Sequence, residues 1–284
     1  MNNIFNIKRF GLVFRKDIME GWKRYLLMFL TMLGIIALML TWNYWEHYRY
    51  IEDTGNQSPW INNRILINLS LMFGAFGLIF ASTFMSPMNS KTKRITYLVC
   101  PSSDFEKYFT RWIIVTIVYI VSFFIAMWVA DALRVAICSA RYPDLDVAFV
   151  DLTKLIDPSV DWKGGGYVFP QYLFIMFVSI YLLFQSLFVL GSTFWEKVSF
   201  VKTFTVGALI VLSFVLLCRW AILLFYGELE GFGNVLNSFE PIDKKNLDKE
   251  RALLYISCVI SVFTLANWVL AFFRFRESEI IKRL

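Results

Sequence analysis

The sequence predicts an all-α integral membrane protein with six transmembrane helices and an amino-terminal amphipathic interfacial helix. The 284-residue chain is 58% hydrophobic and 18% aromatic, which is more apolar than a typical soluble domain. Six apolar runs are long enough for a membrane-spanning helix, which needs roughly 20 residues. Lysine and arginine gather in alternate connections, a pattern typical of multi-pass proteins.

The six predicted spans account for most of the chain. They lie at residues 25–44, 65–85, 112–137, 172–195, 204–226 and 253–273. The chain therefore divides into an amino-terminal segment, residues 1–24, and a transmembrane domain, residues 25–284. No cleavable signal peptide is expected, because the first span follows a long basic segment and lacks a small-residue cleavage pattern.

The charge pattern predicts the orientation of the chain. Basic residues lie in the amino-terminal segment, the second and fourth connections and the tail, whereas acidic residues dominate the loops 138–171 and 227–252. Because cytoplasmic connections carry the excess of lysine and arginine, we expect both termini in the cytoplasm and these two loops outside. We therefore predict a multi-pass protein of the bacterial cytoplasmic (inner) membrane. Its net charge of +6 reflects this asymmetry, and no nucleic-acid partner is expected.

Residues 4–22 have the period of an amphipathic helix. Apolar residues recur at spacings of three and four along one face: Ile7, Phe10, Phe14, Ile18 and Trp22. Basic residues fall on the opposite face, and Leu12 and Met19 interrupt the pattern. We expect this helix to lie in the cytoplasmic interface of the bilayer, either as a plain anchor for the first span or as a brace for a cytoplasmic partner.

A structured hairpin is predicted between the second and third spans, at residues 86–111. The face shared by Lys91 and Arg94 suggests that the second span continues about two turns into the cytoplasm. Cys100-Pro101 should then end it, because proline disfavours a helical conformation at the preceding residue.

The second arm of the hairpin begins with a capping signal. Ser103 and Glu106 have the spacing of a capping box, so a new helix should start near Asp104. We expect three aromatic side chains of the hairpin to be exposed: Tyr97, Phe105 and Tyr108. A solvated loop would explain the basic residues alone, whereas a docking surface explains the proline, the cap and the aromatic residues together.

These features together resemble the membrane subunits of ATP-binding-cassette exporters of the type-2 permease family. The hairpin is similar to a motif of permease-like members from Bacteroides-type bacteria, in the order Lys91…Arg94…Tyr97-Leu98…Pro101-x-Ser103-x-x-Glu106-Lys107…Arg111. The resemblance implies that a cytoplasmic ATPase subunit, which binds the ATP, docks on the hairpin. It also implies a dimer with a second copy or a similar permease. The predicted docking residues are Lys91, Arg94, Tyr97, Pro101, Ser103, Phe105, Glu106 and Lys107.

Small residues in the second span form two small-xxx-small pairs, Ser70/Gly74 and Gly77/Ala81. Small residues let helices approach closely. These pairs predict a helix–helix seam, either within one subunit or along a dimer interface or translocation path.

Three charged residues are expected near the outer interface: Asp131, Arg134 and Arg219. Charges inside a membrane are costly and often functional, but long side chains at this depth can reach water. The three residues therefore predict a structural ion pair, with a proton relay as the alternative.

No catalytic motif is present in the sequence. It lacks the Walker pattern, HExxH and a nucleophile elbow, and contains a single histidine, His47. We therefore expect neither an enzyme nor a cofactor or metal in this chain. The leading hypothesis is a permease subunit of an ATP-driven exporter for an amphipathic or lipid-like substrate. The alternative is a non-transporting scaffold, sensory or immunity protein that binds a soluble partner through the same hairpin.

Overall fold

A computed structural model describes residues 5–55, 61–143, 145, 147, 149–150, 171–195, 198–226 and 246–281. The regular elements of these residues are helical, and six helices are long and apolar enough to cross a membrane, which confirms the predicted fold class. In chain order the elements are α1 (Ile7–Thr54), α2 (Ile61–Ser82), the 3₁₀ turn η1 (Ser86–Met88), α3 (Lys91–Val99), α4 (Asp104–Ile113), the π-helical turn η2 (Ile114–Val118), α5 (Tyr119–Arg141), α7 (Gln171–Phe194), α8 (Ser199–Tyr226) and α10 (Asn246–Ile281). Most of the two predicted outward loops lies outside the described residues.

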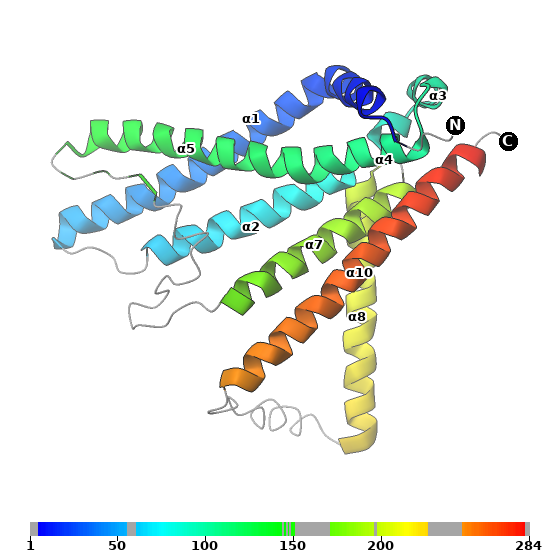
Figure 1. Ribbon diagram of the computed structural model, residues 1–284. Helices are drawn as coiled ribbons and strands as arrows, with labels where there is room; N and C mark the ends of the chain where they lie inside the picture. The colour runs from blue at the N-terminus through cyan, green and yellow to red at the C-terminus, as the bar shows by residue number, and fades with distance from the viewer. Residues whose placement is uncertain are drawn as a thin grey trace.

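Helix α1 joins the predicted amphipathic segment and the first span in one continuous helix of 48 residues. At 1.5 Å per residue it is about 72 Å long, more than twice the roughly 30 Å thickness of a hydrocarbon core. Its first turns, dark blue in Figure 1, change direction relative to the rest of the helix. A large part of α1 therefore extends beyond the first span.

Two groups of helices build the bundle. Helix α1 packs along α5, with α2 beside them, and α7 packs along α10 (Figure 1). The first apolar core lies among α1, α2 and α5, and the second joins the end of α2, α4, α7 and α10. Contacts between α2 and α7 connect the two groups.

The α7–α10 interface has a seven-residue repeat of small residues. The buried positions are Ser179, Ser186 and Thr193 on α7, and Ser257, Thr264 and Ala271 on α10. The two helices run in the same direction and pack along each other (Figure 1), and both rows are buried. Small residues permit close helix approach in a membrane, and the Asn267 side chain donates a hydrogen bond to Ser186 Oγ at 3.1 Å. The sequence interpretation missed this seam.

Half of the predicted small-residue seam of α2 packs against another helix in the described part of the chain. Gly77 and Ala81 are buried, and a Cβ atom on Gly77 would lie 2.5 Å from the Tyr181 hydroxyl. Ser70 is exposed, and a Cβ atom on Gly74 would meet nothing within 4 Å. The Gly77/Ala81 pair is thus a packing seam against α7, whereas Ser70/Gly74 faces away from the described part of the bundle.

Helix α8 diverges from the other helices (Figure 1). It packs on α7 near its first turns, where Gly191 and Thr203 approach closely and Phe188 contacts Phe200. The rest of its described surface is almost entirely exposed and apolar. The bilayer or a neighbouring subunit must cover such a surface.

Candidate functional site

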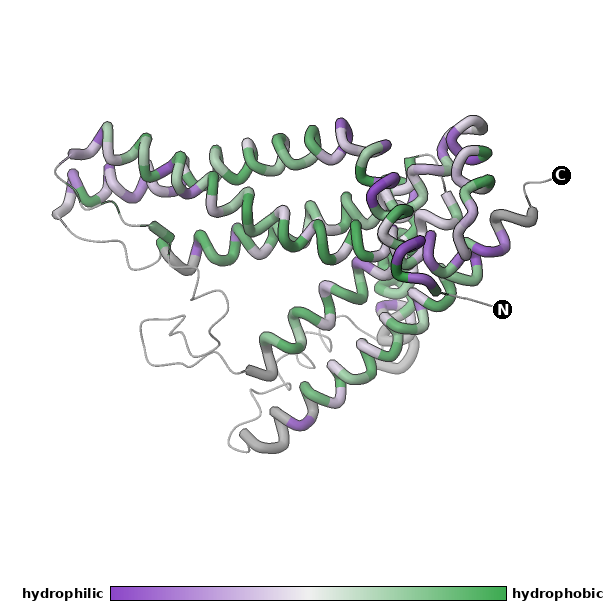
Figure 2. The backbone as a smooth tube through the Cα atoms, turned by 45° about the horizontal axis from the view of Figure 1, so that its top comes forward, coloured by the Kyte–Doolittle hydropathy of each residue, from purple (hydrophilic) through white to green (hydrophobic). Residues whose placement is uncertain are grey.

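The predicted hairpin is formed by α3 and α4, at the same end of the bundle as the first turns of α1 and the last turns of α10 (Figure 1). We call this the hairpin end. Figure 2 shows that hydrophilic residues gather here, whereas the spans are mostly hydrophobic. This distribution is typical of a surface beside the membrane.

Helix α3 is a separate helix, so the expectation that the second span continues through it is wrong. Helix α2 ends at Ser82, and η1 intervenes with Pro87 in its first turn. Ser90 then caps α3 by accepting a hydrogen bond from the Lys93 N–H at 3.4 Å. The predicted stop at Cys100-Pro101 is confirmed, because α3 ends at Val99 and Cys100 is non-helical.

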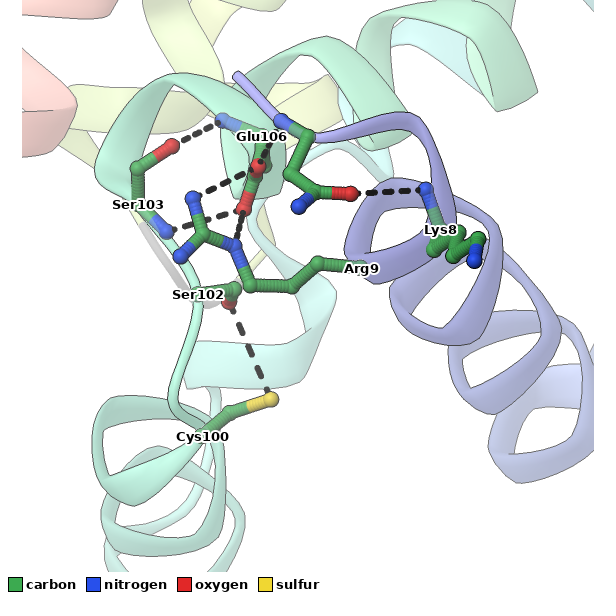
Figure 3. Close-up of polar contacts among 7 residues, drawn as sticks. Lys8, Arg9, Cys100, Ser102, Ser103 and Glu106 are labelled. Atoms are coloured by element: carbon green, nitrogen blue, oxygen red, sulfur yellow. Dashed lines mark hydrogen bonds and ion pairs between the residues drawn. The ribbon is translucent and has the colours of Figure 1, made fainter. Parts of the chain in front are cut away.

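The predicted capping box at the start of α4 is confirmed (Figure 3). The Glu106 N–H donates to Ser103 Oγ at 3.2 Å, and the Ser103 N–H donates to Glu106 Oε2 at 3.1 Å. Two of the free N–H groups at the helix start are thereby satisfied. Asp104 and Glu106 also place negative charge in the first turn, which the helix dipole favours.

Glu106 has a second role, which sequence reasoning missed: its carboxylate holds the start of α1. Arg9 donates to it from Nε at 2.6 Å and from Nη2 at 2.8 Å, and the Asn6 backbone N–H donates at 2.8 Å (Figure 3). The Glu106 side chain is fully buried. Such a two-point pair between a guanidinium and a carboxylate is strong and directional. It therefore fixes residues 5–22, which we call the leader, to the hairpin.

Arg111, five residues further along α4, makes four polar contacts. Its guanidinium donates to the Tyr25 hydroxyl at 2.7 Å, Ser86 Oγ at 2.7 Å and the Phe84 carbonyl at 3.2 Å. Its Nε also lies 3.7 Å from Asp17 Oδ2. Both charged side chains are buried, so the ion pair is screened from water. Arg111 thus connects α4 to α1 and to the turn after α2.

The burial of Asp17 could have been predicted from the sequence. This residue shares the spacing of Phe10, Val13 and Gly21, and Val13 and Asp17 are both buried. An acidic residue on the apolar face of an amphipathic helix indicates a buried basic partner.

Part of the predicted apolar face of the leader packs against protein, whereas we expected this face to lie on the bilayer. The Phe10 ring packs at a tilt against Phe109 of α4, with ring centres 5.7 Å apart, so this side packs against protein. Ile7 and Trp22 are exposed, together with Leu12 and Met19, which had seemed to interrupt the pattern. The side of the leader opposite the hairpin is therefore both apolar and basic.

Two of the three aromatic residues expected to be exposed are buried. The Tyr97 hydroxyl donates to the Lys107 carbonyl at 3.3 Å, and the Lys107 ammonium lies 5.8 Å from the centre of the Tyr97 ring. The Tyr108 hydroxyl donates to the Trp268 carbonyl at 2.8 Å. Phe105 is the partly exposed member of the set, and its ring contacts Phe272. These side chains hold the hairpin against α10.

The outward surface of α3 therefore differs from the prediction, because it has exposed apolar residues among exposed polar ones. Ile95 and Val99 are 63% and 76% exposed, and one helical turn separates them. Pro101 is exposed, and Arg94 bends back to donate to the Met88 carbonyl at 3.0 Å. The side chain of Lys91 lies outside the described residues. We call Ile95, Val99 and Pro101 the hairpin tip.

At the opposite end of the bundle, Asp131 and Arg134 form the predicted ion pair. Arg134 Nε lies 2.6 Å from Asp131 Oδ1, and the guanidinium lies 3.9 Å from the centre of the Tyr44 ring. Asp131 Oδ2 also accepts the Val150 N–H at 2.8 Å. Arg134 is fully buried, and the exposed Arg219 lies apart on the diverging α8. This geometry favours a structural pair.

The fold and this site define an all-α multi-pass membrane protein whose two-helix hairpin is fixed internally by buried polar contacts. Comparisons with known proteins found no family model, no curated protein and no solved structure that matches the chain.

Proposed function

We propose that the chain is the permease subunit of an ATP-driven exporter in a bacterial cytoplasmic membrane, with both termini in the cytoplasm. The hairpin tip is the contact for a separate ATPase subunit. The observation that carries this proposal is the division of the hairpin into an apolar exposed tip and a base held by buried charges. Exposed apolar residues beside polar ones are typical of surfaces that bind a protein.

The internal contacts of the hairpin support its use as a lever. Glu106 connects it to the start of α1, Arg111 to the turn after α2, and Tyr108 to α10. A push on α3 would therefore move the ends of three spans together. A hairpin that merely binds a static partner needs no such bracing, which favours a permease over a scaffold.

The structure supports a different set of ATPase contacts from the set predicted from the sequence. Tyr97, Glu106 and Lys107 are buried by contacts within the chain, so their proposed role is to position the hairpin. Ile95 and Val99 replace them as the proposed contacts, beside Pro101 and Phe105. The proposed substrate remains amphipathic or lipid-like, because the spans are apolar and aromatic.

Co-purification tests this proposal. The tagged chain is extracted from its native membranes in mild detergent, and an ATPase subunit is sought among the bound proteins. We expect Ile95→Asp/Val99→Asp to abolish its recovery, whereas Ile95→Leu/Val99→Ile, which keeps the tip apolar, retains it. Absence of any ATPase with the wild-type chain would contradict the proposal. Recovery of a different soluble protein, lost in the Asp variant, would instead support the scaffold alternative.

A further inference from the structure

A polar cluster lies inside the spans, far from the hairpin tip. It sits where the π-helical turn η2 meets α7. The Gln185 side-chain amide donates to Thr116 Oγ1 at 2.9 Å, and both side chains are buried. Turns of π-helix inside α-helices are rare and are frequent at functional sites.

Two polar atoms of this cluster are buried and find no hydrogen-bond partner among the residues that the structure describes: Gln185 Oε1 and the Tyr181 hydroxyl. The two residues are four apart on α7, so they share one face of the helix. Tyr181 also contacts Phe73 and the backbone at Gly77, where α2 passes close to α7. Burying polar atoms without partners costs free energy, so such pairs are rare unless something binds them.

The α7 side of the cluster lies well inside the membrane span. Gln185 is near the middle of the span Phe174–Phe194, which places it about 15 Å from either edge of the hydrocarbon core. The three segments that meet here, residues 65–82, 112–130 and 171–194, contain no charged residue. An ionised group would find no counter-charge from these segments, whereas a hydroxyl would find an acceptor in Gln185 and a donor or acceptor in Tyr181.

We propose that Gln185, Tyr181 and Thr116 form a binding site for the uncharged, hydroxyl-bearing head of an amphipathic substrate. This inference rests on the proposed function, because a resident lipid keeps its head at the membrane surface, and a head at mid-depth is in transit. Tyr181 is only partly buried, so its ring marks the side from which a lipid-like molecule enters.

Photolabelling of the purified full chain in lipid nanodiscs tests the site without the ATPase. The probe is a 1-acylglycerol with a diazirine next to its ester, and a fatty acid with the same diazirine is the charged comparison. Labelled peptides are identified by mass spectrometry. We expect the acylglycerol to label residues 112–130 and 171–194, and unlabelled acylglycerol to compete. The fatty acid should label these segments at least several-fold less.

Two variants remove the polar atoms and keep the side-chain size. Tyr181→Phe/Gln185→Met should reduce acylglycerol labelling about tenfold, because two hydrogen bonds are lost. Tyr181→Phe alone should reduce it about threefold, and serves if the double variant folds poorly. The matched control is Ser192→Ala, which removes a buried α7 hydroxyl bonded to its own helix. Equal labelling of the double variant and wild type, equal labelling by the fatty acid, or no labelling of these segments would each overturn the site.

The outcomes separate this site from the proposed function. If an ATPase co-purifies but these segments are not labelled, the permease proposal stands and the site fails. If the site is labelled as expected but no ATPase co-purifies, the chain binds a lipid-like molecule at mid-depth without being the subunit of such an exporter.

Discussion

Arg9 and Glu106 are 97 residues apart in the sequence, yet Arg9 Nε lies 2.6 Å from Glu106 Oε2. The pair closes a loop from the first turn of α1 to the first turn of α4. Glu106 is buried while Arg9 is partly exposed, so the carboxylate depends on the guanidinium and the two backbone N–H groups for its hydrogen bonds.

We expect Glu106→Gln to loosen the leader from the hairpin. The neutral amide cannot accept the same set of hydrogen bonds, and the cost should be about 1–3 kcal/mol, since a buried group is left poorly paired. Hydrogen–deuterium exchange of residues 5–15 measures the loosening directly and should rise. Arg15→Gln, an exposed charge on the same helix, should leave the exchange unchanged. Unchanged exchange in Glu106→Gln would show that the pair does not hold the leader.

Arg111 should not tolerate lysine. Three side-chain hydrogen bonds leave the guanidinium in different directions, and a single ammonium on a flexible stem cannot reproduce that fork. We expect Arg111→Lys to lower the yield of monodisperse protein nearly as much as Arg111→Met, as measured by size-exclusion chromatography in detergent. Lys202→Arg, on the exposed side of α8, is the neutral comparison. Normal behaviour of Arg111→Lys would mean that charge alone is needed there.

Gly77→Ala should destabilise the chain, whereas Gly74→Ala should not. A methyl group on Gly77 meets the Tyr181 hydroxyl at 2.5 Å and the Tyr119 ring at 3.1 Å, but on Gly74 it meets nothing within 4 Å. Alanine is also the better helix former by about 1 kcal/mol, so only steric conflict can reverse the sign at Gly77. Thermal unfolding followed by size-exclusion chromatography should give a lower Tm for Gly77→Ala and an equal or higher Tm for Gly74→Ala. A lower Tm for both would remove the distinction between the two halves of the seam.

The features that the sequence predicted correctly depend on residues close together in the chain. The capping box needs only Ser103 and Glu106, and the stop needs only Cys100 and Pro101. The Asp131–Arg134 pair spans one turn of a helix. In each case the spacing alone determines the geometry.

The features that were missed depend on contacts between distant segments. Nothing local to Glu106 indicates that Arg9 binds it. The basic residues Arg111 and Lys107 resemble those that set the orientation of a membrane protein, and only the structure shows that they are buried. The repeat of Ser179, Ser186 and Thr193 was visible in the sequence. Its role as a helix interface depends on the matching row on α10, and only the fold shows that the two helices are adjacent. The leader is a similar case, because its apolar residues can pack against either protein or lipid, and the sequence pattern does not distinguish the two.

Asp131 and Arg134 should behave as a structural unit at the end of the bundle opposite the hairpin. Removing one charge leaves the other buried without its partner, so Arg134→Met should cost about 3–5 kcal/mol. The double variant Asp131→Asn/Arg134→Met should be less destabilised than Arg134→Met alone, because no unpaired charge remains. Thermal unfolding of the three proteins in detergent gives the comparison. If the double variant folds normally yet loses transport in a reconstituted complex, the pair has a role in transport, and the proton-relay alternative would replace the structural one.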